Sequence, residues 1–193
     1  MGPLALKRDE LFTYGDYLTW DDSERWELID GVPYNMTPAP RRIHQLILAD
    51  LIRQFTIYLH LKPCQVYPAP FDVRLPEAGE SDHLVDTVVQ PDLSVICDRK
   101  KLDDAGCRGA PDLIVEILSP GTANKDLKVK FAKYERAGVR EYWIIDPLKK
   151  SLQVNRLGHD GSYGQTEIFS HLDRPRVGIF PDLKIDLEAL FTD

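Results

Sequence analysis

The sequence has 193 residues, of which 43% are hydrophobic and 28% are charged, a composition typical of one globular domain covering residues 1–193 and not of a disordered chain. No apolar run approaches the roughly 18 residues that a membrane-spanning helix needs, and residues 1–8 lack the apolar stretch of a signal peptide, which indicates a cytoplasmic protein with no membrane partner. The 24 basic and 31 acidic residues leave a net charge of −7, so contact with DNA would require a local basic patch, a metal or a groove between two subunits.

The first predicted elements are a short helix and a β-hairpin. Thr13 can cap a helix that includes residues 17 and 18, and residues 25–29 form the first predicted strand. Asp30-Gly31 then marks a tight turn, because both central residues of a type I′ turn need positive φ. Residues 32–35 return as the partner strand.

The longest predicted helix covers residues 41–61. Its apolar side chains recur at intervals of four, four, four and three from Ile43 to Tyr58, which places them on one helical face. Residues 71–75 alternate between apolar and polar side chains, the period of a half-buried strand. Residues 76–86 follow as a polar loop rich in acids.

Two buried strands and a helix are predicted in the centre of the chain. The strands cover residues 93–97 and 113–118, and the second is apolar almost throughout, which is typical of a strand covered on both faces in the middle of a sheet. The helix covers residues 125–137, and Gly138 suits the position that ends it.

The remaining elements complete a mixed α/β fold. Residues 141–145 form another buried strand, and two or three weaker strands lie between residues 152 and 170. The order strand, strand, helix, strand in the middle of the chain predicts a central mixed β-sheet with helices packed on it.

The cysteine content indicates neither crosslinks nor zinc. Cys64, Cys97 and Cys107 are odd in number and show no CxxC spacing. Buried reduced thiols are therefore the expected state.

Two acidic residues stand out because they occur in buried strands. Asp92 stands at the start of the strand at residues 93–97, and Glu116 interrupts the apolar centre of the strand at residues 113–118. A carboxylate in a buried strand is costly unless it is paired or binds a metal. If the strands are neighbours, about 4.8 Å apart, the two carboxylates can share a cation such as Mg²⁺ or Mn²⁺.

Each acid also has a purely structural explanation. Glu116 could form an ion pair with a buried Arg or Lys, or could be a protonated carboxyl bonded to the backbone. Asp92 could cap a turn, and the same Pro-Asp dipeptide recurs at Pro111-Asp112 and Pro181-Asp182.

Lys130 is a third candidate. It lies about 70° from the centre of the apolar stripe of its helix, so its side chain can extend toward the sheet. Asp126, Lys130 and Tyr134 occupy successive turns, and Asp126 can steady the ammonium group. The simpler alternative is a solvated helix lysine.

Further motifs surround these residues. They comprise residues 27–31, 90–93, 109–120 and 138–143, together with His44, Asp126, Lys130 and Tyr134. In this order they resemble the Uma-two family of restriction-endonuclease-like proteins, over residues 17–147 approximately. The resemblance implies the PD-(D/E)xK nuclease fold, a central mixed sheet flanked by helices, with Asp92 as the family's aspartate and Glu116 as its (D/E).

The resemblance also implies a metal site and an unusual source for its lysine. The parent nuclease motif has a lysine two positions after the (D/E), where this chain has Leu118. Lys130 is expected to supply the amine from the next helix instead. Asp92, Glu116 and the Ile117 carbonyl are the expected metal ligands.

His44 and Glu27 complete the candidate site. His44 stands where many relatives carry an acidic residue on the first long helix, and it is an outer ligand or acid–base group by this resemblance; a helix-capping role is the alternative. Glu27 lies beside the predicted hairpin, and a structural ion pair is its alternative.

The leading hypothesis is a Mg²⁺- or Mn²⁺-dependent endonuclease that hydrolyses DNA, acting as a homodimer whose symmetry addresses both strands. A non-catalytic binding or scaffold protein with the same fold is the alternative, favoured by the acidic charge and by Leu118. A hydrolase with Ser119 as nucleophile is disfavoured, because the chain has no GxSxG elbow.

Overall fold

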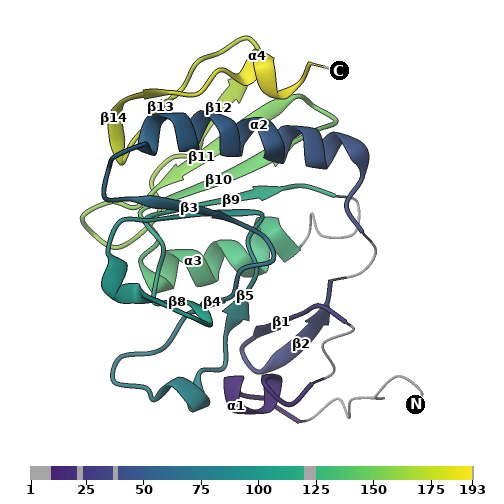
Figure 1. Cartoon of the computed structure of the whole chain (residues 1–193), viewed down its shortest axis with the longest axis vertical. Coiled ribbons are helices and arrows are strands. Elements are labelled where there is room, and N and C mark those ends of the chain that lie inside the picture. The colour runs from purple at the N-terminus through teal and green to yellow at the C-terminus, as the bar shows by residue number, and fades with distance from the viewer. Residues whose placement is uncertain (1–9, 21–23, 37–38, 120–124, 193) are drawn as a thin grey trace.

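The protein is built in layers around a central sheet. The computed structural model describes residues 10–20, 24–36, 39–119 and 125–192, with residues 125–127 described by their backbone alone. Helix α2 (Arg42–Leu59) covers one face of the central sheet, and helix α3 (Phe131–Ala137) lies on the other face, between this sheet and a second one (Figure 1). The predicted mixed α/β fold is confirmed.

The central sheet has six strands in the order β12-β11-β10-β9-β6-β3. Strands β9 and β10 are parallel, and every other neighbouring pair is antiparallel. β9 lies inside the sheet between β10 and β6, as its continuous apolar run predicted. The strands are β3 (Gln65–Pro68), β6 (Leu93–Ile96), β9 (Leu113–Ile117), β10 (Glu141–Asp146), β11 (Ser151–Arg156) and β12 (Glu167–Ser170).

Both faces of β9 are buried because successive side chains point to opposite faces of a sheet. Leu113 and Val115 pack in the core on the α2 side. Ile114 packs in a separate core that includes Tyr134 of α3. Burying each such aliphatic side chain contributes about 1.5–3 kcal/mol, so the strand that carries Glu116 is held rigidly on both sides.

A second six-stranded sheet, in the order β2-β1-β5-β4-β8-β7, lies beyond α3. It contains the predicted hairpin, whose turn residues Asp30 and Gly31 have φ of 52° and 71°. Its other strands are too short to leave a periodic pattern, and the strand predicted at residues 71–75 has only two paired residues. The strands are β1 (Trp26–Ile29), β2 (Val32–Asn35), β4 (Val73–Arg74), β5 (Val88–Val89), β7 (Leu102–Asp103) and β8 (Gly106–Arg108).

The predicted helices form with small changes at their ends. Thr13 caps α1 (Tyr14–Tyr17), and a π-helical segment, Lys125–Lys130, leads into α3, which ends at Gly138 with φ of 86°. No helix of the described residues is long and apolar enough to cross a membrane. The C-terminal elements, which the sequence did not predict, pack against the α2 side: β13 (Arg176–Val177), β14 (Phe180–Lys184) and α4 (Leu187–Leu190).

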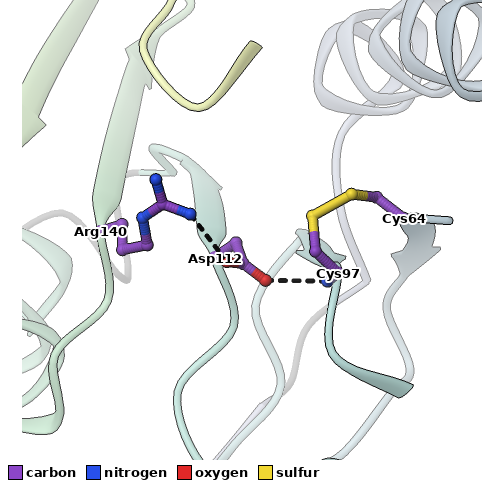
Figure 2. Close-up of a disulfide and its surroundings, with 4 residues drawn as sticks. All are labelled: Cys64, Cys97, Asp112 and Arg140. Carbon is purple, nitrogen blue, oxygen red and sulfur yellow. Dashed lines mark hydrogen bonds and ion pairs between the residues drawn. A yellow bond between two sulfur atoms is a disulfide. The ribbon is translucent and has the colours of Figure 1, made fainter. Parts of the chain in front are cut away.

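The cysteines depart from the prediction. The sequence indicates reduced thiols, but Cys64 and Cys97 form a disulfide (Figure 2). The reason is the antiparallel pairing of β3 with β6, in which Gln65 lies opposite Ile96, so that the next pair outward is the two cysteines, with Cα atoms 3.9 Å apart. Cys107 is a buried free thiol, as expected, and burial raises its pKa to about 11.

We expect Cys64→Ser to lower the free energy of unfolding by about 3 kcal/mol, because the disulfide closes a long loop and restricts the unfolded chain. Urea unfolding with and without dithiothreitol measures the effect. Reductant should destabilise the wild type and Cys107→Ser alike, but leave Cys64→Ser unchanged. Equal unfolding midpoints for the wild type with and without reductant would contradict the prediction.

Candidate active site

The candidate residues gather at one edge of the central sheet, namely the edge formed by the ends of its strands. β9 ends there at Ile117 and β6 begins there after Asp92, because the two strands are antiparallel. The first turn of α2 and the residue before α3, Lys130, reach the same edge through their contacts with these strands. In Figure 1 the start of α2, the arrowhead of β9 and the start of α3 all lie toward the right of the picture, at the same end of the central strands.

Asp92 lies directly before β6, at a bend in the chain. Leu93 pairs with Val115, so Asp92 and Glu116 are the next residues outward from this pair in the two segments. The Asp92 Oδ2 atom accepts a hydrogen bond of 2.7 Å from the Ile117 N–H. Its Oδ1 atom has no protein partner among the described residues, and its side chain is 19% exposed. One oxygen thus fixes the carboxylate while the other is available to a ligand.

His44 holds the same oxygen of Asp92 from the opposite layer. It lies in the first turn of α2 and is buried. Its Nε2 atom is 3.1 Å from Asp92 Oδ2, and its Nδ1 atom is buried with no hydrogen-bond partner among the described residues. The imidazole therefore positions Asp92 through one nitrogen.

Glu116 is held from the α3 side. Its Oε1 atom accepts hydrogen bonds of 2.8 Å from the Lys130 ammonium and 2.8 Å from the Tyr134 hydroxyl. Burial, followed by the carboxylates of Glu116 and Glu27, raises the pKa of Tyr134 well above its usual value. The hydroxyl therefore stays protonated and acts as a hydrogen-bond donor.

The ammonium group of Lys130 is buried and contacts two carboxylates. The Lys130 Nζ atom lies 2.6 Å from Glu27 Oε1 as well as 2.8 Å from Glu116 Oε1. The exposed fractions are 0% for Glu27, 1% for Lys130 and 4% for Glu116. An unpaired ion in such a low-dielectric environment costs several kcal/mol. Each of these three residues therefore needs its oppositely charged partner to remain buried in the charged form.

Lys130 is therefore not the solvated lysine that was the simpler alternative, and it contacts Glu116 from the helix as the apolar stripe predicted. Asp92 directly precedes β6, and β6 pairs with β9, the strand that carries Glu116, as their positions predicted; a metal shared by their carboxylates stays a prediction. Glu27 forms the ion pair that was its structural alternative. The side chain of Asp126, expected to steady Lys130, lies outside the described residues.

Gln90 is a positioning residue that sequence reasoning missed. Its backbone N–H donates to Glu27 Oε1 at 2.9 Å. Its side-chain oxygen accepts from Arg25, and its side-chain nitrogen donates to Asp72 and Tyr17. Its place two residues before Asp92 was the one available signal, but nothing in the sequence connects it with Glu27.

The donor atoms fit a hard divalent cation. Among the described residues, no group of three or more His, Cys, Asp or Glu side chains could hold a metal ion. A site made of two carboxylates, a backbone carbonyl and water needs no third side chain of this kind. Asp92 Oδ1, which has no protein partner in the described part of the chain and belongs to a partly exposed side chain, is the atom that fits such a site best.

A mixed sheet flanked by helices, with two acidic residues and a lysine gathered at one end of its strands, is the arrangement expected of a restriction-endonuclease-like protein. The chain belongs to the Uma2 family, described as "Putative restriction endonuclease", whose model matches residues 14–188. The predicted family is thus confirmed.

Two further proteins are similar to this chain. A crystal structure of a protein from Anabaena variabilis, described as a putative nuclease belonging to DUF820, superposes with a TM-score of 0.73 at 20% identity, covering 93% of this chain and 97% of that one. An uncharacterised protein of Synechocystis is 26% identical over 156 residues, which are 77% of this chain and 75% of the relative. The first likeness shows a common fold.

Proposed function

We propose that the protein is a divalent-metal-dependent endonuclease that hydrolyses phosphodiester bonds of DNA. The observation that carries the proposal is the buried 2.8 Å contact between Lys130 and Glu116, at the sheet edge where Asp92 Oδ1 has no protein partner among the described residues. Through this contact Lys130 would take the place of the motif lysine, whose usual position is occupied by Leu118 in this chain. Family membership supports the same class of activity.

Asp92, Glu116 and the Ile117 carbonyl would hold the metal, Mg²⁺ or Mn²⁺ by the preference of oxygen ligands. The bound ion would polarise the phosphodiester and lower the pKa of a coordinated water. His44 and the Ile117 N–H fix the orientation of Asp92. Tyr134 fixes that of Glu116.

Lys130 supplies a preorganised positive charge next to the reacting centre. Glu27 and Glu116 hold its ammonium in place, so little reorganisation is needed when negative charge develops on the phosphate. Gln90 in turn orients Glu27 through its backbone N–H. The lysine is thus fixed from both sides.

The proposal also includes an assembly and a location. One domain over residues 1–193 would act as a homodimer, with the two edges addressing the two DNA strands, in the cytoplasm. Light scattering coupled to gel filtration measures the oligomeric state directly.

The proposed function is tested by incubating supercoiled plasmid with the wild type in Mg²⁺, in Mn²⁺ and in EDTA. We expect nicked and linear products with metal and none with EDTA. Calorimetric titration of both metals into wild type and Glu116→Ala should show a site that the variant loses. Metal binding by neither protein, or cleavage at an equal rate in EDTA, would favour the non-catalytic binding protein or another mechanism.

A further inference from the structure

An acidic protein that cleaves DNA needs a local surface that attracts phosphates. The chain has a net charge of −7, and nucleic-acid affinity comes largely from Lys and Arg contacts with the backbone. Such a surface requires basic side chains close to the sheet edge that carries Asp92 and Glu116.

Two segments far apart in sequence bring basic residues to this edge. His44 contacts Asp92, so Arg41 and Arg42, at the start of α2, lie within one helical turn of the site. On the other side, Ile145 of β10 pairs with Ile117 of β9. The turn that follows β10 carries the second basic pair.

That turn presents Lys149 and Lys150. It is closed by Asp146, whose Oδ1 accepts from the N–H groups of Leu148 and Lys149. The Lys149 ammonium lies 3.6 Å from Asp146, but the lysine side chain is 76% exposed and the acid only 13%. Such an exposed pair holds a lysine weakly, so Lys149 can still meet a phosphate.

We infer that Arg41, Arg42, Lys149 and Lys150, all exposed, form a basic rim that binds the sugar–phosphate backbone of duplex DNA on either side of the carboxylate centre. The start of α2 adds to the positive potential. Its first turn contains no acidic residue and no side-chain cap, and the N–H end of a helix carries a partial positive charge.

Two groups of acidic residues lie away from the rim. Glu77, Glu80, Asp82 and Asp86 belong to the segment between β4 and β5, Asp103 ends β7, and Asp104 lies in the turn between β7 and β8. Both segments are part of the second sheet, whereas the rim belongs to the central sheet and α2. These six acidic residues therefore do not border the rim.

The opposite edge of the central sheet provides a matched control. Arg99 and Lys100 follow the end of β6 and are exposed; since β6 begins at the candidate site, they lie at the other end of the strand. The double variants Arg41→Glu/Lys149→Glu and Arg99→Glu/Lys100→Glu each reverse one arginine and one lysine. The two double variants lower the net charge by the same amount, and they differ only in where the substitutions lie.

The inference rests on the proposed function, and its test measures binding separately from cleavage. Fluorescence anisotropy with a short labelled DNA duplex in EDTA, between about 50 and 200 mM salt, gives the affinity and its salt dependence. We expect the rim variant to bind at least about 10-fold more weakly, with a salt slope smaller by about 2. The opposite-edge variant should stay within about twofold of the wild type.

Equal weakening by both variants, no weakening by the rim variant, or no binding by the wild type would overturn the inference. Rim-dependent binding without cleavage would refute the proposed endonuclease and leave the inference standing. Cleavage at the wild-type rate by the rim variant would refute the inference and leave the proposed endonuclease standing. Unchanged thermal unfolding of both variants shows that the comparison concerns folded protein.

Discussion

Replacing Lys130 by Met should lower the free energy of unfolding by about 3–5 kcal/mol, because it leaves two buried carboxylates without their shared cation. Glu27 and Glu116 both contact the ammonium, at 2.6 and 2.8 Å, and neither is more than 4% exposed. Denaturation by urea, followed by tryptophan fluorescence, measures the loss. Lys128→Met is the control, because Lys128 lies on the same helical segment but is exposed, and it should change stability by no more than about 0.5 kcal/mol.

The same substitution should lower cleavage by at least about 100-fold, the scale associated with loss of a preorganised electrostatic group. Metal binding should persist, since Asp92 and Glu116 remain. A loss of stability could imitate this result, so a second variant is needed. Glu27→Gln/Lys130→Met removes one of the facing charges, while the amide oxygen can still accept from the Gln90 N–H.

We expect this double variant to recover about 1–3 kcal/mol relative to Lys130→Met, as coupled residues do, and yet remain inactive. A double variant that is both stable and fully active would show that Lys130 has a purely structural role. The comparison therefore separates the ion pair from the chemistry.

The sequence predicts the parts of this site that follow from local periodicity. Glu116 stands out because a charge interrupts an apolar strand, and Lys130 because it flanks an apolar helical stripe. These features depend on residues close together in the chain.

Contacts between distant segments could not be predicted in the same way. Glu27 contacts Lys130 across about a hundred residues of chain, from a sheet whose strands are two to four residues long. The disulfide shows the same limitation. Cys64 and Cys97 carry no spacing signal, and only the register of β3 against β6 places them opposite each other.

Asp92 raises a different problem, because the sequence contains the same Pro-Asp dipeptide before β9. The structure shows that Asp112 repeats part of the arrangement of Asp92: its Oδ2 accepts from the Cys97 N–H at 2.8 Å, as Asp92 Oδ2 accepts from the Ile117 N–H at 2.7 Å. The two contacts lie at opposite ends of the same antiparallel pair. Capping the neighbouring strand is thus common to both residues and does not identify a catalytic acid.

The second oxygen distinguishes them. Asp112 Oδ1 is 3.2 Å from the exposed guanidinium of Arg140 (Figure 2), whereas Asp92 Oδ1 has no protein partner among the described residues. His44 also contacts Asp92, whereas no histidine among the described residues contacts Asp112. Asp112→Asn is therefore a control with the same dipeptide, the same backbone contact and the same loss of charge.

Asp92→Asn should abolish metal-dependent cleavage while the fold survives. Both side-chain contacts of Asp92 with the described residues fall on Oδ2, so the amide oxygen of asparagine can take over both. Its NH₂ group then replaces Oδ1, which none of these residues contacts. Loss of the charge should cost about 1 kcal/mol of stability, but it removes an anionic metal ligand, so calorimetric affinity for Mg²⁺ or Mn²⁺ should fall with activity. Asp112→Asn should lose comparable stability and cleave plasmid at the wild-type rate. Equal activity of Asp92→Asn and Asp112→Asn would mean that Asp92 is only a strand cap, and the endonuclease proposal would lose its first ligand.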